Sequence, residues 1–504
     1  MKNKGKVYLV GAGPGEAGLI TVKGLECLKK ADTVIYDRLV SGKLLRYIPQ
    51  DAKRIYAGKS ASRHTLTQNE INSLLAGEAK KGATVVRLKC GDPFLFGRGA
   101  EEALFLSEHR IPFEVVPGVS SAMAVPAYAG IPLTHRAYTS SVGIFTGHEE
   151  AERENSQICW EKIATGLGTL VFLMGVENLS TIVNKLISCG RADTSPCCII
   201  QQGADCGQKS VCARLKTIVK KAKENDIRAP AVLVVGEVVS LREKINWFEN
   251  RPLFGKRILI SRPAETESRL SNILEGYGAS CVEAPAVELR PLKDYTALDS
   301  YIRNIDDFQW IILSSQSGIR FFMKRVEYLK KDARAFGMVK IAVIGRGTAE
   351  ALERFCLKPD LMPEHFCQEG LLESFKKINI KESKILIVCA RQARDVLAQG
   401  LKKMGAKVSV APAYITVNAP GIRRIAPDAG DVDVITFTSA LAVNNFFQVF
   451  PAAAFRRLKT KPLIATIGPI TSNAVRGKGL NPAIQAKEYT FEGLAGAIAK
   501  YYKK

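Results

Sequence analysis

Long apolar runs are missing from this 504-residue sequence. None approaches the roughly 18 consecutive apolar residues that a helix needs to cross a bilayer. The basic start, Met1–Lys6, leads directly into a short apolar segment at Val7–Val10 and a glycine turn. An export signal would need a longer apolar stretch and a cleavage site of small residues. We therefore expect a cytoplasmic protein with no membrane partner.

Metal-binding patterns are also missing. The 12 cysteines include no CxxC pair, and the densest group, between Cys189 and Cys212, fits no zinc-ligand spacing. We therefore expect buried, reduced thiols and no metal. Of the 5 histidines only His365 lies beyond residue 256, so the second half offers a single histidine for a Ser-His-Asp triad.

Nucleotide-binding fingerprints are incomplete. The turn Gly11–Gly15 follows the first apolar segment, but Glu16 stands where a GxGxxG fingerprint has its third glycine. Pro14 also lacks the backbone donor that a pyrophosphate would use. Asp37, near the end of the second expected strand, partly mimics a ribose-binding carboxylate. A nicotinamide or flavin site therefore stays open as the weaker alternative.

Acidic residues are few relative to basic ones: 49 Asp and Glu stand against 72 Lys and Arg, a formal charge of +23. Such a surplus attracts nucleic acid, acidic lipid or a polyanionic small molecule. The cations are spread along the whole chain, and we find no zinc finger, RNP-type aromatic motif or basic heptad. We therefore expect no nucleic-acid partner, although charge alone does not choose among anions.

Short apolar segments alternate with amphipathic ones, which predicts an α/β fold with largely parallel sheets. Leu19–Leu28, for example, has apolar residues at helical spacing. The pattern starts afresh between Asn246 and Lys256, which predicts two fused units of about 250 residues each. The clearest expected strands are Val7–Val10, Thr33–Tyr36, Thr84–Leu88, Leu170–Met174 and Ala231–Val235, then Trp310–Ser314, Ile341–Ile344, Ile385–Val388, Val434–Phe437 and Leu463–Ile467.

The stretch Gly91–Gly99 is the most informative turn of the sequence. It lies between the expected strand Thr84–Leu88 and a helical pattern that begins near Ala100. Its glycines let the backbone approach a bound molecule, and Asp92 and Arg98 can orient a polar ligand. An ordinary glycine-rich loop is the alternative for this segment taken alone.

Taken together, the motifs of the first half resemble those of uroporphyrinogen-III C-methyltransferases, members of the tetrapyrrole methylase family. The resemblance covers about residues 5–248. It implies the two-subdomain fold of that family, which is typically dimeric. The motifs that carry it, in order, are Gly11–Gly15, Tyr36–Val40, Gly58-Lys59, Gly91–Gly99, Val116–Ala122, Pro132–Arg136, Thr146–Glu149 and Phe172–Gly175.

The resemblance implies S-adenosylmethionine as methyl donor and uroporphyrinogen III as acceptor, methylated at C2 and C7 to give precorrin-2. It assigns Asp37 as proton acceptor and Lys59 as proton donor. Arg38 and Arg98 would bind substrate carboxylates, for which a guanidinium is well shaped. The residues implied around the donor are Pro14, Gly91, Asp92, Ser120, Ser121, Met174 and Gly203.

Each of these roles has a structural alternative. Asp37 could cap the next turn, Lys59 could be a solvated loop charge, and Arg98 could form an internal ion pair.

Small hydroxyl residues recur at the ends of the expected strands in the second half. Ligands of open α/β sheets bind at those ends, although helix capping is the alternative for each Ser or Thr. With their neighbours these residues resemble uroporphyrinogen-III synthase over residues 256–504. The supporting segments are Ile260–Pro263, Leu313–Ser315, Val343–Gly345 with Thr348-Ala349, Tyr414, Phe437–Ser439, and Ile467–Pro469 with Thr471.

The second resemblance implies two flavodoxin-like lobes, one of about residues 256–290 plus 418–504 and one of 291–417. The implied reaction closes hydroxymethylbilane to uroporphyrinogen III with inversion of ring D and needs no cofactor. Tyr414 is the candidate proton donor, with an ordinary strand aromatic as the alternative. The candidate carboxylate binders are Arg262, Ser315, Thr348, Arg391, Thr438 and Ser439.

We therefore expect a bifunctional enzyme that makes uroporphyrinogen III and methylates it, supplying sirohaem or cobalamin synthesis. Its expected domains are residues 1–248 for the methyltransferase, a linker at 249–255, and 256–504 for the synthase, with a homodimer formed through the methyltransferase half. The alternative is a methyltransferase joined to a non-catalytic, two-lobed binding or regulatory module.

Overall fold

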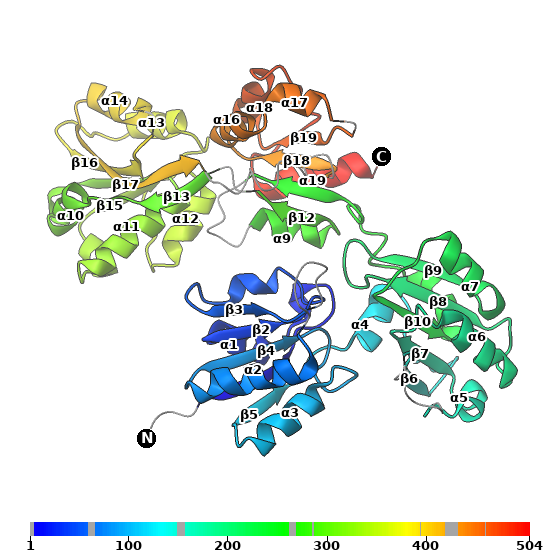
Figure 1. Ribbon diagram of the computed structural model, residues 1–504. Helices are drawn as coiled ribbons and strands as arrows, with labels where there is room; N and C mark the ends of the chain where they lie inside the picture. Colours follow the sequence, from blue (N-terminus) through cyan, green and yellow to red (C-terminus); the bar gives the residue numbers. More distant parts are fainter. Residues whose placement is uncertain are drawn as a thin grey trace. The chain divides into compact units, whose positions relative to one another are not determined.

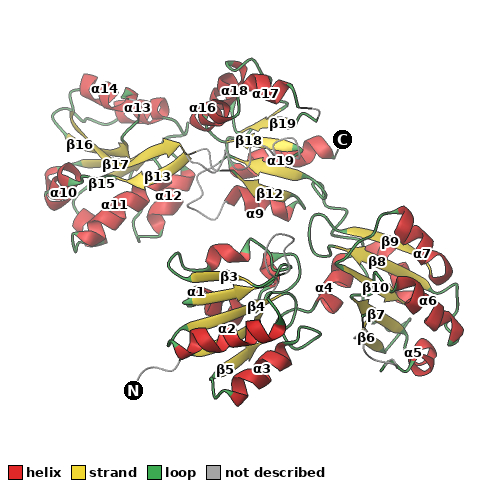
Figure 2. Ribbon diagram, in the orientation of Figure 1, coloured by secondary structure: helices red, strands yellow, loops and turns green. Residues whose placement is uncertain are grey.

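In the part of the chain that the structure describes, strands and helices alternate through four sheets of five strands each (Figures 1 and 2). Among the described helices, none is both long and apolar enough to span a membrane. The fold is α/β, as the sequence predicts. The computed structural model describes residues 5–58, 66–148, 157–261, 269–284, 287–393, 395–418, 432–458 and 460–503.

All strands of the first sheet are parallel, and both faces of the sheet are covered. On β1, Val7 and Leu9 pack into one apolar cluster while Val10 packs into another. Because side chains alternate along a strand, a strand buried on both faces is a continuous apolar run. The strand order is β3 (Lys53–Tyr56), β2 (Thr33–Tyr36), β4 (Thr84–Lys89), β1 (Lys6–Gly11) and β5 (Phe113–Val116).

The helices of this sheet begin at side-chain caps or turns. Thr67 and Glu70 form a reciprocal capping box at the start of α2, which lies across one face of the sheet in Figure 1. Thr21 caps α1, so the helix begins at Val22, and the expectation of helix from Leu19 was wrong by one turn. The helices of this sheet are α1 (Val22–Lys29), α2 (Gln68–Lys80) and α3 (Gly99–Glu108), whereas α4 (Ser121–Tyr128), which follows β5, packs against the second sheet.

The second sheet is mixed rather than parallel. Strand β10 runs antiparallel to both of its neighbours, and β9 runs antiparallel to β8. Its strand order is β6 (Val142–Thr146), β7 (Thr169–Leu173), β10 (Ala231–Val235), β8 (Pro196–Gln201) and β9 (Lys209–Arg214). Its helices are α5 (Trp160–Gly166), α6 (Leu179–Ser188), α7 (Leu215–Glu224) and α8 (Arg242–Ile245).

The third sheet joins segments far apart in the sequence. Strand β11 pairs with β18, so residues near 260 lie beside residues near 435. Its strand order is β12 (Ser280–Glu283), β11 (Arg257–Ile260), β18 (Val434–Phe437), β19 (Leu463–Thr466) and β20 (Ile484–Gln485). Its helices are α9 (Arg269–Gly276), α16 (Ala440–Val449), α17 (Ala452–Arg456), α18 (Pro469–Arg476) and α19 (Phe491–Tyr502).

The fourth sheet is parallel except for β13, which runs antiparallel to β17. Its strand order is β13 (Val287–Pro291), β17 (Lys407–Asn418), β16 (Lys384–Ala390), β14 (Trp310–Leu313) and β15 (Lys340–Val343). Its helices are α10 (Thr296–Arg303), α11 (Gln316–Tyr328), α12 (Arg346–Glu353), α13 (Gln368–Lys376) and α14 (Val396–Lys403).

The chain divides into two compact units. One comprises residues 1–257, 274–280 and 499–504, and the other comprises 258–273 and 281–498. The expected domain and lobe limits stay predictions. All 12 cysteines are free thiols, but Cys159, Cys212 and Cys356 are exposed. The expectation that the thiols are buried was therefore wrong for these three.

Candidate active sites

The first sheet brings most of the expected methyltransferase residues to one edge. Its strands are parallel, so the turns that follow them leave from the same side. Lys59, expected after β3, lies outside the described residues. The residues at this edge are Pro14 after β1, Asp37 and Arg38 after β2, Gly91 and Asp92 after β4, and Ser120 and Ser121 after β5.

Glycine backbones close this edge tightly. The Gly13 amide donates to the Gly91 carbonyl over 3.2 Å, and the Gly91 amide donates to the Gly13 carbonyl over 3.1 Å. A Cβ on Gly118 would lie 2.3 Å from the Gly91 carbonyl oxygen and 2.7 Å from Gly11 Cα. Only glycine permits such an approach. The turns after β1, β4 and β5 therefore pack backbone against backbone.

The Asp92 carboxylate organises the Gly91–Gly99 turn. Its Oδ1 accepts hydrogen bonds from the amides of Phe94 at 2.8 Å and Leu95 at 3.1 Å. Its Oδ2 accepts from the amide of Gly118 at 3.0 Å. A carboxylate that accepts several backbone amides is strongly held in place. Asp92 thus ties its own turn to the turn after β5.

A small cradle lies beside Gly91, at the start of α4. The Ser121 amide is 3.6 Å from the point where a Gly91 Cβ would stand, and a side chain would fill that space. Ser120 Oγ accepts from the Ala122 amide at 3.2 Å, so its oxygen caps the helix. Its hydroxyl hydrogen can still donate. The cradle offers a polar ligand glycine backbone and a helix N-terminus.

Met174 and Gly203 come from the second sheet. Both β7 and β8 run antiparallel to β10, so the turns after them leave on the same side. Met174 has a positive φ of 55° and is 51% exposed. A Cβ on Gly15 would lie 2.4 Å from the carbonyl oxygen of Ala204. The turn after β1 and the turn after β8 are therefore in contact.

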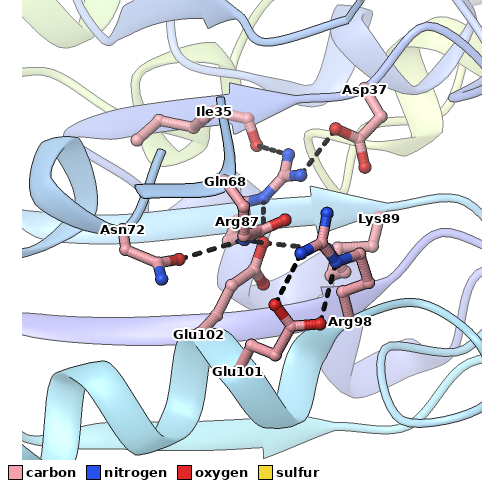
Figure 3. Close-up of polar contacts among 9 residues, drawn as sticks. All are labelled: Ile35, Asp37, Gln68, Asn72, Arg87, Lys89, Arg98, Glu101 and Glu102. Atoms are coloured by element: carbon pink, nitrogen blue, oxygen red, sulfur yellow. Dashed lines mark hydrogen bonds and ion pairs between the residues drawn. The ribbon is translucent and has the colours of Figure 1, made fainter. Parts of the chain in front are cut away.

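Asp37 is held by a buried ionic cluster (Figure 3). The Arg87 guanidinium donates from one terminal nitrogen to Asp37 Oδ1 at 2.6 Å and from Nε to Glu102 Oε1 at 3.0 Å. Lys89 Nζ lies 2.9 Å from the same Glu102 oxygen. The Arg87, Lys89 and Glu102 side chains are 3%, 4% and 0% exposed, whereas that of Asp37 is 31% exposed. Asp37 is therefore the exposed end of the cluster.

The sequence analysis did not single out Arg87, Lys89 or Glu102. A usable signal was present, because two cations stand within an otherwise apolar strand. Burial lowers the pKa of Lys89 below its ordinary value of 10.5, and the Arg87 charge lowers it further. Within the described ranges, no three His, Cys, Asp or Glu side chains group to hold a metal ion.

Arg38 and Arg98 differ in their surroundings. Arg38 is exposed directly after Asp37. Arg98 has a positive φ of 58° and forms a two-point ion pair with Glu101, with Nε to Oε1 at 2.8 Å and a terminal nitrogen to Oε2 at 2.7 Å. The internal ion pair considered as the alternative for Arg98 is therefore present. Its side chain is 58% exposed, so the guanidinium also remains accessible.

Ser315 and Tyr414 are adjacent at the carboxyl edge of the fourth sheet. Ser315 Oγ lies 3.2 Å from the Tyr414 hydroxyl oxygen and also caps α11 by accepting from the Gly318 amide at 3.0 Å. The Tyr414 ring stacks on Phe321, with centroids 5.2 Å apart. Burial raises the pKa of Tyr414 above its ordinary value of 10.0. The hydroxyl therefore stays protonated at neutral pH and is available as a hydrogen-bond donor.

Arg391 and Thr348 lie at the same edge, after β16 and β15. The Arg391 amide donates to the Tyr414 carbonyl at 2.9 Å, and the Arg391 residue is exposed. Thr348 is 8% exposed, in the first turn of α12. Helices α11 and α12 begin close together, since a Cβ on Gly347 would lie 2.4 Å from Gln316 Nε2. Neighbouring helix N-termini of this kind favour anionic groups.

Thr438 and Ser439 follow β18 at the carboxyl edge of the third sheet. Ser439 Oγ accepts from the Ala442 amide at 3.2 Å and so caps α16, while Thr438 is half-buried. Arg262, expected after β11, lies outside the described residues. Capping is thus the observed role of the Ser439 oxygen, and carboxylate binding stays a prediction.

The fold and these edges define a protein in which a methylase precedes a second α/β enzyme. Residues 6–219 match the family Tetrapyrrole (Corrin/Porphyrin) Methylases. Residues 268–496 match Uroporphyrinogen-III synthase HemD. Both resemblances drawn from the motifs are confirmed.

Similar proteins extend over nearly the whole chain. A porphyrin biosynthesis protein HemD of Ruminiclostridium josui is 39% identical over 490 residues, which is 96% of this chain and 95% of that protein. A uroporphyrinogen-III C-methyltransferase of Bacillus subtilis is 40% identical over 366 residues, 72% of this chain and 74% of that one. The chain belongs to the family in which a tetrapyrrole methylase is fused to uroporphyrinogen-III synthase HemD. It is a bifunctional uroporphyrinogen-III synthase and uroporphyrinogen-III C-methyltransferase.

Among solved structures, a uroporphyrin-III C-methyltransferase of Thermus thermophilus in complex with S-adenosyl homocysteine matches with 39% identity. The match covers 47% of this chain and 100% of that chain, with a TM-score of 0.41.

Proposed function

We propose that the first unit methylates uroporphyrinogen III at C2 and C7, with Asp37 as the proton acceptor. The observation that supports this is the position of Asp37. Its carboxylate lies at the same sheet edge as the glycine turns, half-exposed, and a buried guanidinium fixes one of its oxygens. A carboxylate held by a cation and open to solvent on one side suits proton transfer from a bound substrate.

S-adenosylmethionine supplies an activated methyl group on a sulfonium. The residues that would hold it are Pro14, Gly91, Asp92, Ser120, Ser121, Met174 and Gly203. The cradle beside Gly91 fits the polar part of the donor, because glycine allows close backbone approach and a helix N-terminus favours a carboxylate such as that of the donor's methionine moiety. The chain's main contribution is orientation, since the methyl must lie in line with the attacking carbon.

Arg38 and Arg98 bind acetate or propionate groups of the macrocycle in this proposal. Both are exposed arginines next to the sheet edge, and a guanidinium pairs with a carboxylate through two hydrogen bonds. Glu101 pairs with the Arg98 guanidinium through two hydrogen bonds, and the substrate carboxylate would compete for it in this proposal. Lys59 is the proposed proton donor, on the strength of the motif alone.

In the second unit, Tyr414 donates a proton to the hydroxyl that leaves hydroxymethylbilane. That loss gives a cation whose ring closure through a spiro intermediate inverts ring D. The proposal is supported by the protonated Tyr414 hydroxyl beside Ser315. Carboxylates of the substrate would be bound by the basic and hydroxyl residues Arg262, Ser315, Thr348, Arg391, Thr438 and Ser439.

We further propose that the protein is a homodimer formed through its methyltransferase half. Large apolar side chains are exposed there, with Phe94 at 55%, Leu104 at 65% and Met123 at 59%. Contiguous exposed apolar surface is typical of interfaces, and in this proposal these side chains contribute to one. Analytical ultracentrifugation of the intact chain and of a Leu104→Glu variant tests this, and a monomeric wild type would contradict it.

The function is tested by supplying hydroxymethylbilane without and then with S-adenosylmethionine. We expect type III uroporphyrinogen alone in the first case and a doubly methylated product in the second, identified by chromatography and mass. Type I product at the spontaneous rate would refute the synthase activity of the second unit. Supplied uroporphyrinogen III then tests the methyltransferase separately.

A further inference from the structure

Glu102 lies at the centre of the buried cluster behind Asp37 (Figure 3). Its Oε1 accepts from Arg87 Nε at 3.0 Å, from Lys89 Nζ at 2.9 Å and from Gln68 Nε2 at 3.3 Å. Within the described part of the chain, its Oε2 has no hydrogen-bond partner although it is buried. One carboxylate oxygen thus gathers donors from α2 and β4, while the carboxylate itself comes from α3.

Arg87 connects this cluster to the site. Its Nε is bound by Glu102, one terminal nitrogen donates to Asp37 Oδ1 at 2.6 Å, and the other donates to the Ile35 carbonyl at 3.4 Å. The guanidinium is planar, so fixing Nε and one terminal nitrogen determines where the third nitrogen points. Glu102 therefore sets the direction of the bond that reaches Asp37.

Glu102 supplies the counter-charge that the buried Arg87 and Lys89 need, but stability alone does not account for the whole ionic cluster. A buried polar atom without a partner is destabilising. Buried ion pairs can often be replaced by apolar side chains of similar volume without loss of stability. The arrangement is better explained by the orientation that it imposes on Arg87.

We propose that Glu102 is a positioning residue for methyl transfer, which fixes Arg87 so that Arg87 holds the Asp37 carboxylate in the orientation that accepts the proton. This inference rests on the proposed role of Asp37. It names a residue that touches neither the substrate nor the donor.

The first test is Glu102→Gln in the full chain. We expect the kcat for methylation of uroporphyrinogen III to fall roughly 10- to 100-fold, since a displacement of about 1 Å at a reacting group can cost that much. The KM for the acceptor and the affinity for S-adenosylhomocysteine, measured by calorimetry, should stay at wild-type values. An unchanged kcat, or an affinity that falls as much as kcat, would overturn the proposal.

Glu78→Gln is the matched control. Glu78 is also a buried carboxylate that accepts from two lysines, Lys53 and Lys81, each at 2.8 Å, and from Thr33 at the start of β2. Through Thr33, Glu78 contacts the first residue of β2, whereas Asp37 follows the last residue of that strand. This variant should keep the wild-type kcat even if its melting temperature falls.

A double-mutant cycle with Asp37→Asn separates positioning from general stability. Single-turnover transfer of a labelled methyl group gives the rates of the slow variants. If Glu102 acts through Asp37, then Glu102→Gln should slow the Asp37→Asn enzyme by less than about twofold, because the Asp37 carboxylate that Glu102 helps to position is already absent. The same loss in both backgrounds would refute the proposal while leaving the role of Asp37 intact.

A wild-type rate in Asp37→Asn would instead refute the proposed acceptor, and this inference with it. Should Glu102→Gln fail to fold, as judged by circular dichroism, Arg87→Lys takes its place in the cycle. Lysine keeps the charge but cannot reach Glu102 and Asp37 together. We expect a similar loss of kcat from Arg87→Lys, and again no further loss on the Asp37→Asn background.

Discussion

The glycine packing at the methyltransferase edge leads to a quantitative prediction for Gly118→Ala. The added methyl would stand 2.3 Å from the Gly91 carbonyl oxygen, 2.7 Å from Gly11 Cα and 2.8 Å from the Gly11 carbonyl carbon. All three neighbours are backbone atoms, so none can rotate aside as a side chain would. Ordinary contact begins at 3.4 Å, so the turns after β4 and β5 must separate by about 1 Å. Overpacking of this kind costs about 1–3 kcal/mol.

The displaced turn leads into Ser120 and Ser121, so the cradle beside Gly91 should open. We expect the affinity for S-adenosylhomocysteine to fall at least tenfold, equivalent to about 1.4 kcal/mol. The first unit should also melt several degrees lower, since about 1 kcal/mol corresponds to roughly 2–4 °C at this size. Calorimetric titration measures the affinity, and thermal unfolding followed by circular dichroism measures the stability.

Gly77→Ala is the control for this experiment. Gly77 lies within α2, and a Cβ there would meet no atom within 4 Å. The change should leave the affinity unchanged and stabilise the helix by about 0.5–1 kcal/mol. Wild-type affinity and melting temperature in Gly118→Ala would refute the reasoning about the closed backbone packing.

Three further predictions concern single side chains. Tyr414→Phe should lower the rate of type III formation roughly 100-fold or more, while type I product still forms. The wild-type rate should show no loss from Tyr414 ionisation below pH 10.0, because burial raises the pKa of Tyr414. A wild-type rate in the variant would exclude the donor role. Asp92→Asn should destabilise the first unit by about 1–3 kcal/mol in urea unfolding, since one acceptor oxygen is replaced by a donor facing backbone amides. Folding lowers the pKa of Lys89, so between the lowered pKa and 10.5 the unfolded chain binds more protons than the folded chain. The free energy of unfolding of the wild type should therefore rise with pH across this window, and Lys89→Met should lack that rise. An identical pH dependence in both proteins would contradict the prediction.

Apolar strands were the part of the fold most readily predicted from the sequence. Thr33–Tyr36, Ala231–Val235 and Val434–Phe437 were predicted with the limits that β2, β10 and β18 have. A strand covered on both faces must be apolar throughout, so its limits are visible in the residues themselves. Helix starts are harder to predict from the sequence. The start of α1 depends on which side chain accepts a hydrogen bond from a free amide of its first turn, and Thr21 accepts from Gly24.

The sequence by itself determined the family, the strand–helix alternation and the motifs at the strand ends. The strand–helix alternation and each motif are local, because each depends on residues within one segment, and the family follows from the order of those motifs along the chain. Only the tertiary structure decided which ionic groups meet. Arg87 and Lys89 stand in one strand and Glu102 in a helix further along the chain, and neither segment indicates which residue pairs with which. Burial makes that pairing obligatory, since unpaired charges in the interior are strongly unfavourable, and the connection to Asp37 exists only in the folded chain.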